Sequence, residues 1–231
     1  FVALPGVSAD GRDFVDTALA AGVGAVLYHL DDGDMPPTDP RVLGLPGLKA
    51  QTDPDFSFLI VTGDNLPPAY AERLASLVQD FPQAIILPRS PGPIRQVMQD
   101  AINTHRDDSD DPCLQFRHDD DDAVGLRFVE LLRQTAQDCR NLLDRNRLTA
   151  IDFNRGFIAR PDATGLLACE NMTPYYGVAL AVAAQKGVKQ TIMNFAHNRL
   201  NRFMPTVTRT DVDMFVRGHN DFNDSRQKPG I

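Results

Sequence analysis

The sequence predicts an α/β fold with a mostly parallel central sheet flanked by helices, and two observations support this class. Short apolar runs of strand length alternate with longer segments whose apolar residues recur at helical spacing, which is typical of a sheet with helices on its faces. The run "FSFLIVTG" (residues 56–63) is almost continuously apolar, as strands buried on both faces are. In such sheets ligands bind beyond the carboxyl ends of the strands.

The first 30 residues predict a small strand-helix-strand element. "FVALPG" and "VGAVLYHL" are the two strand segments, and "DGRDFVDTALAAG" between them has a helical pattern that Gly22 is suited to end. The segment "LDDGDMPPTDP" (residues 30–40) is rich in proline, glycine and aspartate, which indicates a loop or linker. We therefore divide the chain into an N-terminal segment of residues 1–40 and a main domain of residues 41–231.

The main domain continues the alternation up to Thr149. After the first apolar run, a segment has its apolar residues at helical spacing and predicts a helix. "AIILP" then predicts a second strand. Another amphipathic segment leads to the strand "CLQF", and the apolar positions from Val129 to Leu143 predict one helix. After Thr149 the turn signal "PDATG" between two apolar runs predicts a hairpin. "QTIMNFAHNRL" and "FMPTVTRT" are further predicted strands, and "FVRGHNDFNDSRQKPGI" is a predicted polar tail.

Composition and charge exclude several classes of partner. The 231 residues carry a formal net charge of -8, so nucleic acid and anionic membranes are not expected as main partners. The three cysteines are odd in number and widely spaced, which predicts free thiols and no disulfide framework. The longest apolar stretch, Phe14 to Leu30, contains Asp16 and is short of the roughly 20 residues of a membrane span. No basic region precedes it, so we expect a cytoplasmic protein without a signal peptide.

Four consecutive aspartates, Asp119 to Asp122, follow the predicted strand "CLQF". Crowded carboxylates raise one another's pKa unless a cation neutralises them, and a strand end would place them in the ligand crevice. Such oxygen ligands suit Mg²⁺ or Mn²⁺ bound together with substrate phosphates. The alternative is that the aspartates cap the next helix and complement its dipole. A second acidic run, "HRDDSDDP" (residues 105–112), has polar neighbours and predicts a solvated loop.

Several separated motifs resemble those of a known family. "LPGLKAQTDPDFSFLIVTGDNLPPAY", "RHDDDDA", "DFNRGFIAR", "TIMNFAHNRL" and "RGHNDFNDSR" occur in order between Arg41 and Gln227. Together they resemble the bacterial rhamnosyltransferase family of GT-A-type, Rossmann-like glycosyltransferases. The resemblance implies transfer of a sugar from a nucleotide-diphosphate donor to a glycan or small-molecule acceptor. It also implies a DxD motif, Asp119 and Asp121 with Asp122 beside them, that holds Mn²⁺ or Mg²⁺ on the donor.

A second resemblance concerns only the N-terminal segment. Residues 1–29 resemble the start of the Mur ligase N-terminal domain. The phosphate-binding GKT or GKS loop that those ligases need for ATP is absent from all 231 positions. Ligase chemistry is therefore not supported.

The remaining candidates combine position with this resemblance. Asp64 ends an apolar strand and would contact the nucleoside of the donor, or else caps the next helix. Arg95 begins a helix and would reach phosphate, or is a surface arginine. His197 and His219 are candidates for a third metal ligand, against a structural role for each. The candidates for a catalytic base toward the acceptor hydroxyl are Asp152 and Glu170.

Two other functions remain open at this point. Clustered aspartates also hold paired metals in phosphohydrolases, which would release phosphate from simple esters. A non-catalytic nucleotide-sugar-binding remnant would bind a nucleoside diphosphate without turnover.

Overall fold

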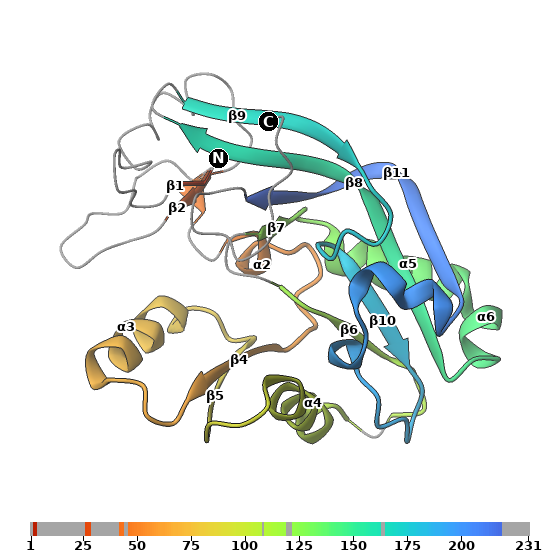
Figure 1. The fold of residues 1–231 in the computed structure, drawn as a ribbon, viewed down its shortest axis with the longest axis horizontal. Coiled ribbons are helices and arrows are strands. Elements are labelled where there is room, and N and C mark those ends of the chain that lie inside the picture. Colours follow the sequence, from red (N-terminus) through yellow and green to blue (C-terminus); the bar gives the residue numbers. More distant parts are fainter. Residues whose placement is uncertain are drawn as a thin grey trace.

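A computed structural model describes residues 2–3, 26–28, 42–43, 46–107, 109–118, 122–162 and 165–218. Within these ranges the protein has a mixed α/β architecture with one large sheet, two smaller sheets and helices packed around them (Figure 1). No helix within these ranges is both long enough and apolar enough to cross a membrane.

A strand-helix-strand unit follows the short helix α2 (Pro46–Lys49). Strands β4 (Phe58–Gly63) and β5 (Ala84–Arg89) pair in parallel, and α3 (Pro68–Val78) connects them. Helix α4 (Ile94–His105) leads away from β5. Both α3 and α4 are preceded by a proline at the N-cap, where the fixed φ of proline suits a helix start and its missing N–H costs nothing. The predicted elements of this region are confirmed.

The large sheet has six strands, and it is mixed. They are β6 (Cys113–Phe116), β7 (Asp122–Val124), β8 (Leu148–Asp162), β9 (Gly165–Met172), β10 (Leu180–Ala184) and β11 (Thr206–Gly218). The order is β6-β10-β8-β11-β7, with β9 paired to β8. Of these pairs β11–β8 is parallel, and β10–β6, β10–β8, β11–β7 and β8–β9 are antiparallel.

The prediction of a mostly parallel central sheet is therefore wrong. Only two residues separate β8 from β9, and a connection that short can join antiparallel strands only. The hairpin predicted at "PDATG" is confirmed by this pair. The alternation of strands and helices in the sequence stops at Thr149. It therefore indicated the parallel pairing of β4 and β5 in the first half of the chain, but it gave no information on the pairing of the strands that follow.

Two further predictions are corrected by local chemistry. "QTIMNFAHNRL" forms the short 3-10 helices η2 (Ile192–Asn194) and η3 (His197–Arg202) instead of a strand. The Thr191 hydroxyl accepts from the Met193 N–H and the Asn194 side chain accepts from the Thr191 N–H, a capping box that starts a helical turn. The single helix expected between Val129 and Leu143 is broken at Cys139 into α5 (Phe128–Asp138) and α6 (Arg140–Asp144).

The core lies between α5 and the large sheet. Phe128 is fully buried and makes edge-to-face ring contacts with Phe116 at 5.0 Å and Phe153 at 5.7 Å between centroids. All five residues of β10 are buried, so this strand is covered on both faces. The cysteines Cys113, Cys139 and Cys169 are free and half-buried, as predicted for the thiols, although none is fully buried.

One close approach of two strands depends on a glycine. A Cβ added at Gly156 in β8 would lie 2.2 Å from the Phe215 carbonyl oxygen of β11. We expect Gly156→Ala to lower the free energy of unfolding by about 1–3 kcal/mol, because the overlap forces backbone to move. Urea unfolding measures this, and Gly92→Ala is the control, since its nearest neighbour is a movable Val97 methyl at 3.2 Å. Equal unfolding midpoints for the two variants would contradict the expectation.

Three short strands form a separate sheet, with β1 and β2 from the N-terminal segment and β3 from the start of the main domain. β1 (Val2–Ala3) and β3 (Val42–Leu43) pair in parallel with β2 (Val26–Tyr28) on its two sides. The two strands of the predicted strand-helix-strand element are confirmed, and the helix predicted between them lies outside the described residues. The division at residue 40 stays a prediction.

Candidate functional site

A loop of unusual backbone conformation joins β9 to β10. Within residues 173–179, Tyr175 has a φ of 57°, Gly177 of 106° and Ala179 of 52°. Positive φ is costly for residues with a Cβ, and such strain is concentrated at functional sites. The surrounding residues must therefore hold this loop in place, which makes its neighbours the first candidates for a site.

Asp152 of β8 is the buried residue that holds the loop. Its side chain is 0% exposed, and its Oδ2 accepts a hydrogen bond from the Tyr175 N–H at 3.1 Å. Burial raises the pKa of the Asp152 carboxyl to about 6, while the hydrogen bonds from Tyr175 and from the Thr208 side chain act in the opposite direction. The carboxyl therefore gains its charge near neutral pH rather than near pH 4.

The backbone carbonyl of Tyr175 also orients the side chain of His197 in η3. The His197 Nδ1 lies 2.7 Å from the Tyr175 carbonyl oxygen. A carbonyl oxygen only accepts, so Nδ1 carries a proton, and in the neutral imidazole the lone pair is then on Nε2. A backbone carbonyl on one nitrogen is the usual arrangement for a histidine that binds a metal or a proton through the other.

Arg117 and His197 lie against the same face of Gly177. A Cβ added at Gly177 would be 3.4 Å from Arg117 Nη2 and 3.5 Å from His197 Cγ. Arg117 follows the end of β6 and is half-buried. A half-buried cation beside a histidine and a glycine is suited to binding an anion.

Asp122 is linked to the same loop through Tyr176. It begins β7, is 5% exposed, and faces Arg217 across the β7–β11 ladder. The Arg217 guanidinium lies 5.0 Å above the Tyr176 ring. Burial raises the pKa of the Tyr176 hydroxyl, the Arg217 charge lowers it, and the Asp122 charge raises it. Asp122 therefore acts electrostatically on the loop that also carries Tyr175 and Gly177.

The structure brings three of the predicted site residues to this loop: Asp122, Asp152 and His197. Asp119, Asp121 and His219 lie outside the described residues. The proposed helix cap is not formed by Asp122, because Asp122 belongs to β7 and α5 starts at Phe128 after Arg127 without a side-chain cap. No group of three or more potential ligands occurs within the described ranges.

The remaining predicted residues lie elsewhere. Asp64 is exposed at the end of β4, where its Oδ2 accepts from the Ser90 hydroxyl at 2.5 Å. It does not cap α3, whose N-cap is Pro67. Arg95 is exposed in the first turn of α4, and Glu170 is exposed on β9. In the second acidic run, Asp110 is 96% exposed and pairs with Lys186, as expected of a solvated loop.

The sequence reasoning missed Arg117, Tyr175, Tyr176, Gly177 and Arg217. A signal was present for the loop, because "TPYYG" places a proline, two tyrosines and a glycine between two apolar runs, which is turn chemistry. Arg117 stands two residues before the aspartates, so a positive charge adjoins the acidic run in the sequence. Nothing in the sequence indicated Arg217, because only the β7–β11 register brings it to Asp122.

Comparison with known proteins identifies the protein family. Residues 41–231 match the model of the family described as "Putative rhamnosyl transferase", and the chain belongs to this family. The family's description indicates a glycosyltransferase, an enzyme that moves a sugar from a donor to an acceptor. A search of the curated proteins finds no match.

Proposed function

We propose that this protein is a GT-A-like glycosyltransferase that moves a sugar from a nucleotide-diphosphate donor, with a divalent metal, at the site around residues 173–179. The observation that carries the proposal is the convergence of Asp122, Arg117 and His197 on this loop. A carboxylate, an arginine and a histidine with a free lone pair are the groups that metal-dependent binding of a diphosphate requires.

The metal would be held by Asp119, Asp121 and Asp122, with His219 or His197 as a further ligand. Carboxylate oxygens and imidazole fit Mn²⁺ or Mg²⁺. Asp122, the last of the four aspartates, is opposite Arg217 in the antiparallel ladder. When bound, the metal would supply Lewis-acid stabilisation of the charge that develops on the departing diphosphate.

The diphosphate would also contact Arg117. Its guanidinium lies against Gly177 beside His197, and its planar fork would donate to two phosphate oxygens. Gly177 leaves this face open, since any side chain there would meet Arg117 and His197. Asp64 and Arg95 remain candidates for the nucleoside and the phosphate of the donor.

The two candidate bases differ in exposure. Asp152 is fully buried and bonded to the loop backbone, so an acceptor hydroxyl would not reach it, and its role would be to position Tyr175. Glu170 is exposed on β9. In an inverting reaction a carboxylate removes the acceptor proton, and Glu170 is then the better candidate.

Incubation with a panel of nucleotide sugars and Mn²⁺ tests the proposal. We expect hydrolysis or transfer with one donor and none after chelation of the metal. Phosphate release from simple esters would favour a phosphohydrolase instead. Binding of a nucleoside diphosphate in calorimetry without turnover of any donor would favour a non-catalytic binding protein.

Arg117→Ala is expected to weaken binding of a nucleoside diphosphate at least tenfold, because a charge-assisted hydrogen bond contributes about 1.5–3 kcal/mol. Isothermal titration calorimetry with Mn²⁺ measures the loss. Arg145→Ala is the matched control, since Arg145 is exposed and lies at the end of α6. Equal affinities for the two variants would remove Arg117 from the site.

A further inference from the structure

Three consecutive residues of β8 hold the loop of residues 173–179. Phe153 and Asn154 bond to its two ends through the backbone, at 3.2 Å and 2.9 Å. Between these two contacts the Asp152 Oδ2 accepts from the Tyr175 N–H at 3.1 Å. Of the three contacts, the one from Asp152 is made by a side chain, so a substitution can remove it and leave the other two in place.

Tyr175 is bonded through both of its backbone polar groups. Its N–H donates to Asp152, and its carbonyl accepts from the His197 Nδ1 at 2.7 Å. Its φ is 57°, in the left-handed region that a residue with a Cβ rarely adopts. With the N–H fixed, rotation about the N–Cα bond decides where the carbonyl points. At an ordinary negative φ the same carbonyl would be turned away from His197.

The element that carries His197 is fixed independently of this bond. Leu200 of η3 is 1% exposed, and it belongs to a cluster of buried apolar residues against which the Tyr175 side chain also packs. Packing of this kind holds η3 in place without the loop backbone. A turn of the Tyr175 backbone would therefore change the hydrogen bond at the His197 Nδ1 and leave η3 where it is.

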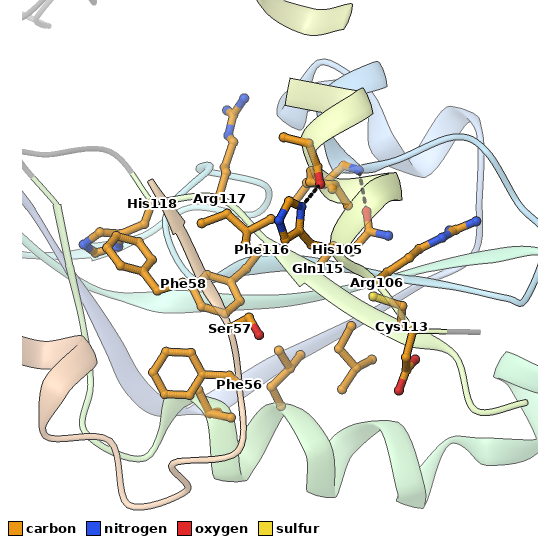
Figure 2. A pocket seen from close by; sticks show the side chains of 18 of the residues that line it. Phe56, Ser57, Phe58, His105, Arg106, Cys113, Gln115, Phe116, Arg117 and His118 are labelled. Atoms are coloured by element: carbon orange, nitrogen blue, oxygen red, sulfur yellow. Dashed lines mark hydrogen bonds between the residues drawn. The ribbon is translucent and has the colours of Figure 1, made fainter. Parts of the chain in front are cut away.

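The histidine held in this way lies beside Arg117. Figure 2 shows Arg117 and its neighbour Phe116 pointing in opposite directions at the end of β6. Phe116 packs on Phe128. A Cβ added at Gly177 would lie 3.4 Å from the Arg117 Nη2 and 3.5 Å from the His197 Cγ. The loop therefore carries both the carbonyl that orients His197 and the open face that Arg117 and His197 share.

We propose that Asp152 is a positioning residue for His197. By accepting from the Tyr175 N–H, Asp152 keeps Tyr175 in the left-handed conformation, and the Tyr175 carbonyl then holds a proton on the His197 Nδ1. In the neutral imidazole this leaves the lone pair on Nε2, the atom that would bind a metal or a proton. The place of His197 in a glycosyl-transfer site rests on the proposed function, whereas the link from Asp152 to His197 rests on the contacts described above.

The test measures the imidazole tautomer of His197 in the protein without metal or donor. At about pH 8, above the ordinary pKa of histidine, nitrogen NMR spectra distinguish a protonated ring nitrogen from a bare one. The signals lost in His197→Gln identify this residue among the five histidines. We expect the wild type to carry the proton on Nδ1. A wild type that carries it on Nε2 would overturn the proposal, because Nδ1 could then not donate to Tyr175.

Two variants of Asp152 remove the acceptor and a third keeps it. Asp152→Leu retains a side chain branched at the same carbon, Asp152→Ala leaves space instead, and neither side chain accepts from the Tyr175 N–H. In both we expect the ratio of the Nδ1–H to the Nε2–H tautomer to fall at least about threefold, as for loss of a hydrogen bond of ordinary net strength. Asp152→Asn retains an acceptor, and its ratio should stay within about twofold of the wild type.

Ile151→Val is the control for general destabilisation. Ile151 is the neighbouring residue of β8, is also 0% exposed, and packs in the core cluster on the opposite face of the strand. Its variant should keep the wild-type ratio. An unchanged ratio in Asp152→Leu or Asp152→Ala would overturn the proposal, and so would an equal fall in Ile151→Val. Loss of the Nδ1–H tautomer in Asp152→Asn would overturn it too, and this result stands by itself if the other two variants do not fold.

The failure of this inference differs from the failure of the proposed function. If the tautomer responds as expected but the wild type transfers sugar from no donor, the positioning role holds and the proposed function fails. If the wild type transfers sugar and the tautomer does not respond to substitution of Asp152, the positioning role alone fails.

Discussion

The variants Asp119→Ala and Asp121→Ala are each expected to lose the Mn²⁺-dependent rise in melting temperature that the proposed function predicts for the wild type with a nucleoside diphosphate. A ligand at 100 times its dissociation constant stabilises the folded state by about 2.7 kcal/mol, so the wild-type shift should be several degrees. In the proposed site the aspartates would bind the metal together with the diphosphate, so loss of one carboxylate would weaken both contacts. Thermal melting with and without Mn²⁺ measures the effect.

The same variants should keep or gain stability in the absence of metal. Four adjacent carboxylates repel one another, and deleting one relieves that repulsion. The matched control is the pair Asp108→Ala and Asp110→Ala in the second acidic run, which should change binding and stability by no more than about 0.5 kcal/mol. A full metal-dependent shift in the Asp119 and Asp121 variants would show that these aspartates do not hold the metal.

The second large effect concerns the buried carboxyl of Asp152. Its pKa is raised by burial from 3.8 to about 6, so the folded state holds the proton that the unfolded state has already released above pH 4. Stability from this group is therefore present at low pH and is lost as pH rises from about 4 to about 6. Asp152→Asn removes this titration and keeps an acceptor for the Tyr175 N–H.

We expect Asp152→Asn to be more stable than the wild type by up to about 3 kcal/mol at pH 8, and similar to it at pH 3, where both side chains are neutral. Urea unfolding across this pH range measures the difference. The pKa values of Glu130 and Asp211 are lowered to about 2 by Arg127 and Arg209, and their titration affects both proteins equally. Asp110→Asn is the exposed control, and parallel pH curves for all three proteins would contradict the expectation.

The sequence by itself determined the first half of the fold. Apolar runs of strand length and helical periodicity located β4, α3, β5, α4 and β6, because these patterns express which face of each element is buried. It also determined the hairpin of β8 and β9, whose turn residues leave few conformations. The family followed from ordered motifs, and the match over residues 41–231 confirms it.

Only the tertiary structure decided the direction of pairing in the second half and the membership of the site. A strand sequence does not state which neighbour it will pair with, so the mixed order of the large sheet could not be inferred. Likewise Asp152, His197 and the segment that holds Arg117 and Asp122 are far apart in the chain, and they lie around the strained loop at Tyr175 and Gly177. Residue type indicated which side chains can bind a diphosphate, but long-range packing selected those that lie together, because contact between distant residues depends on the whole fold.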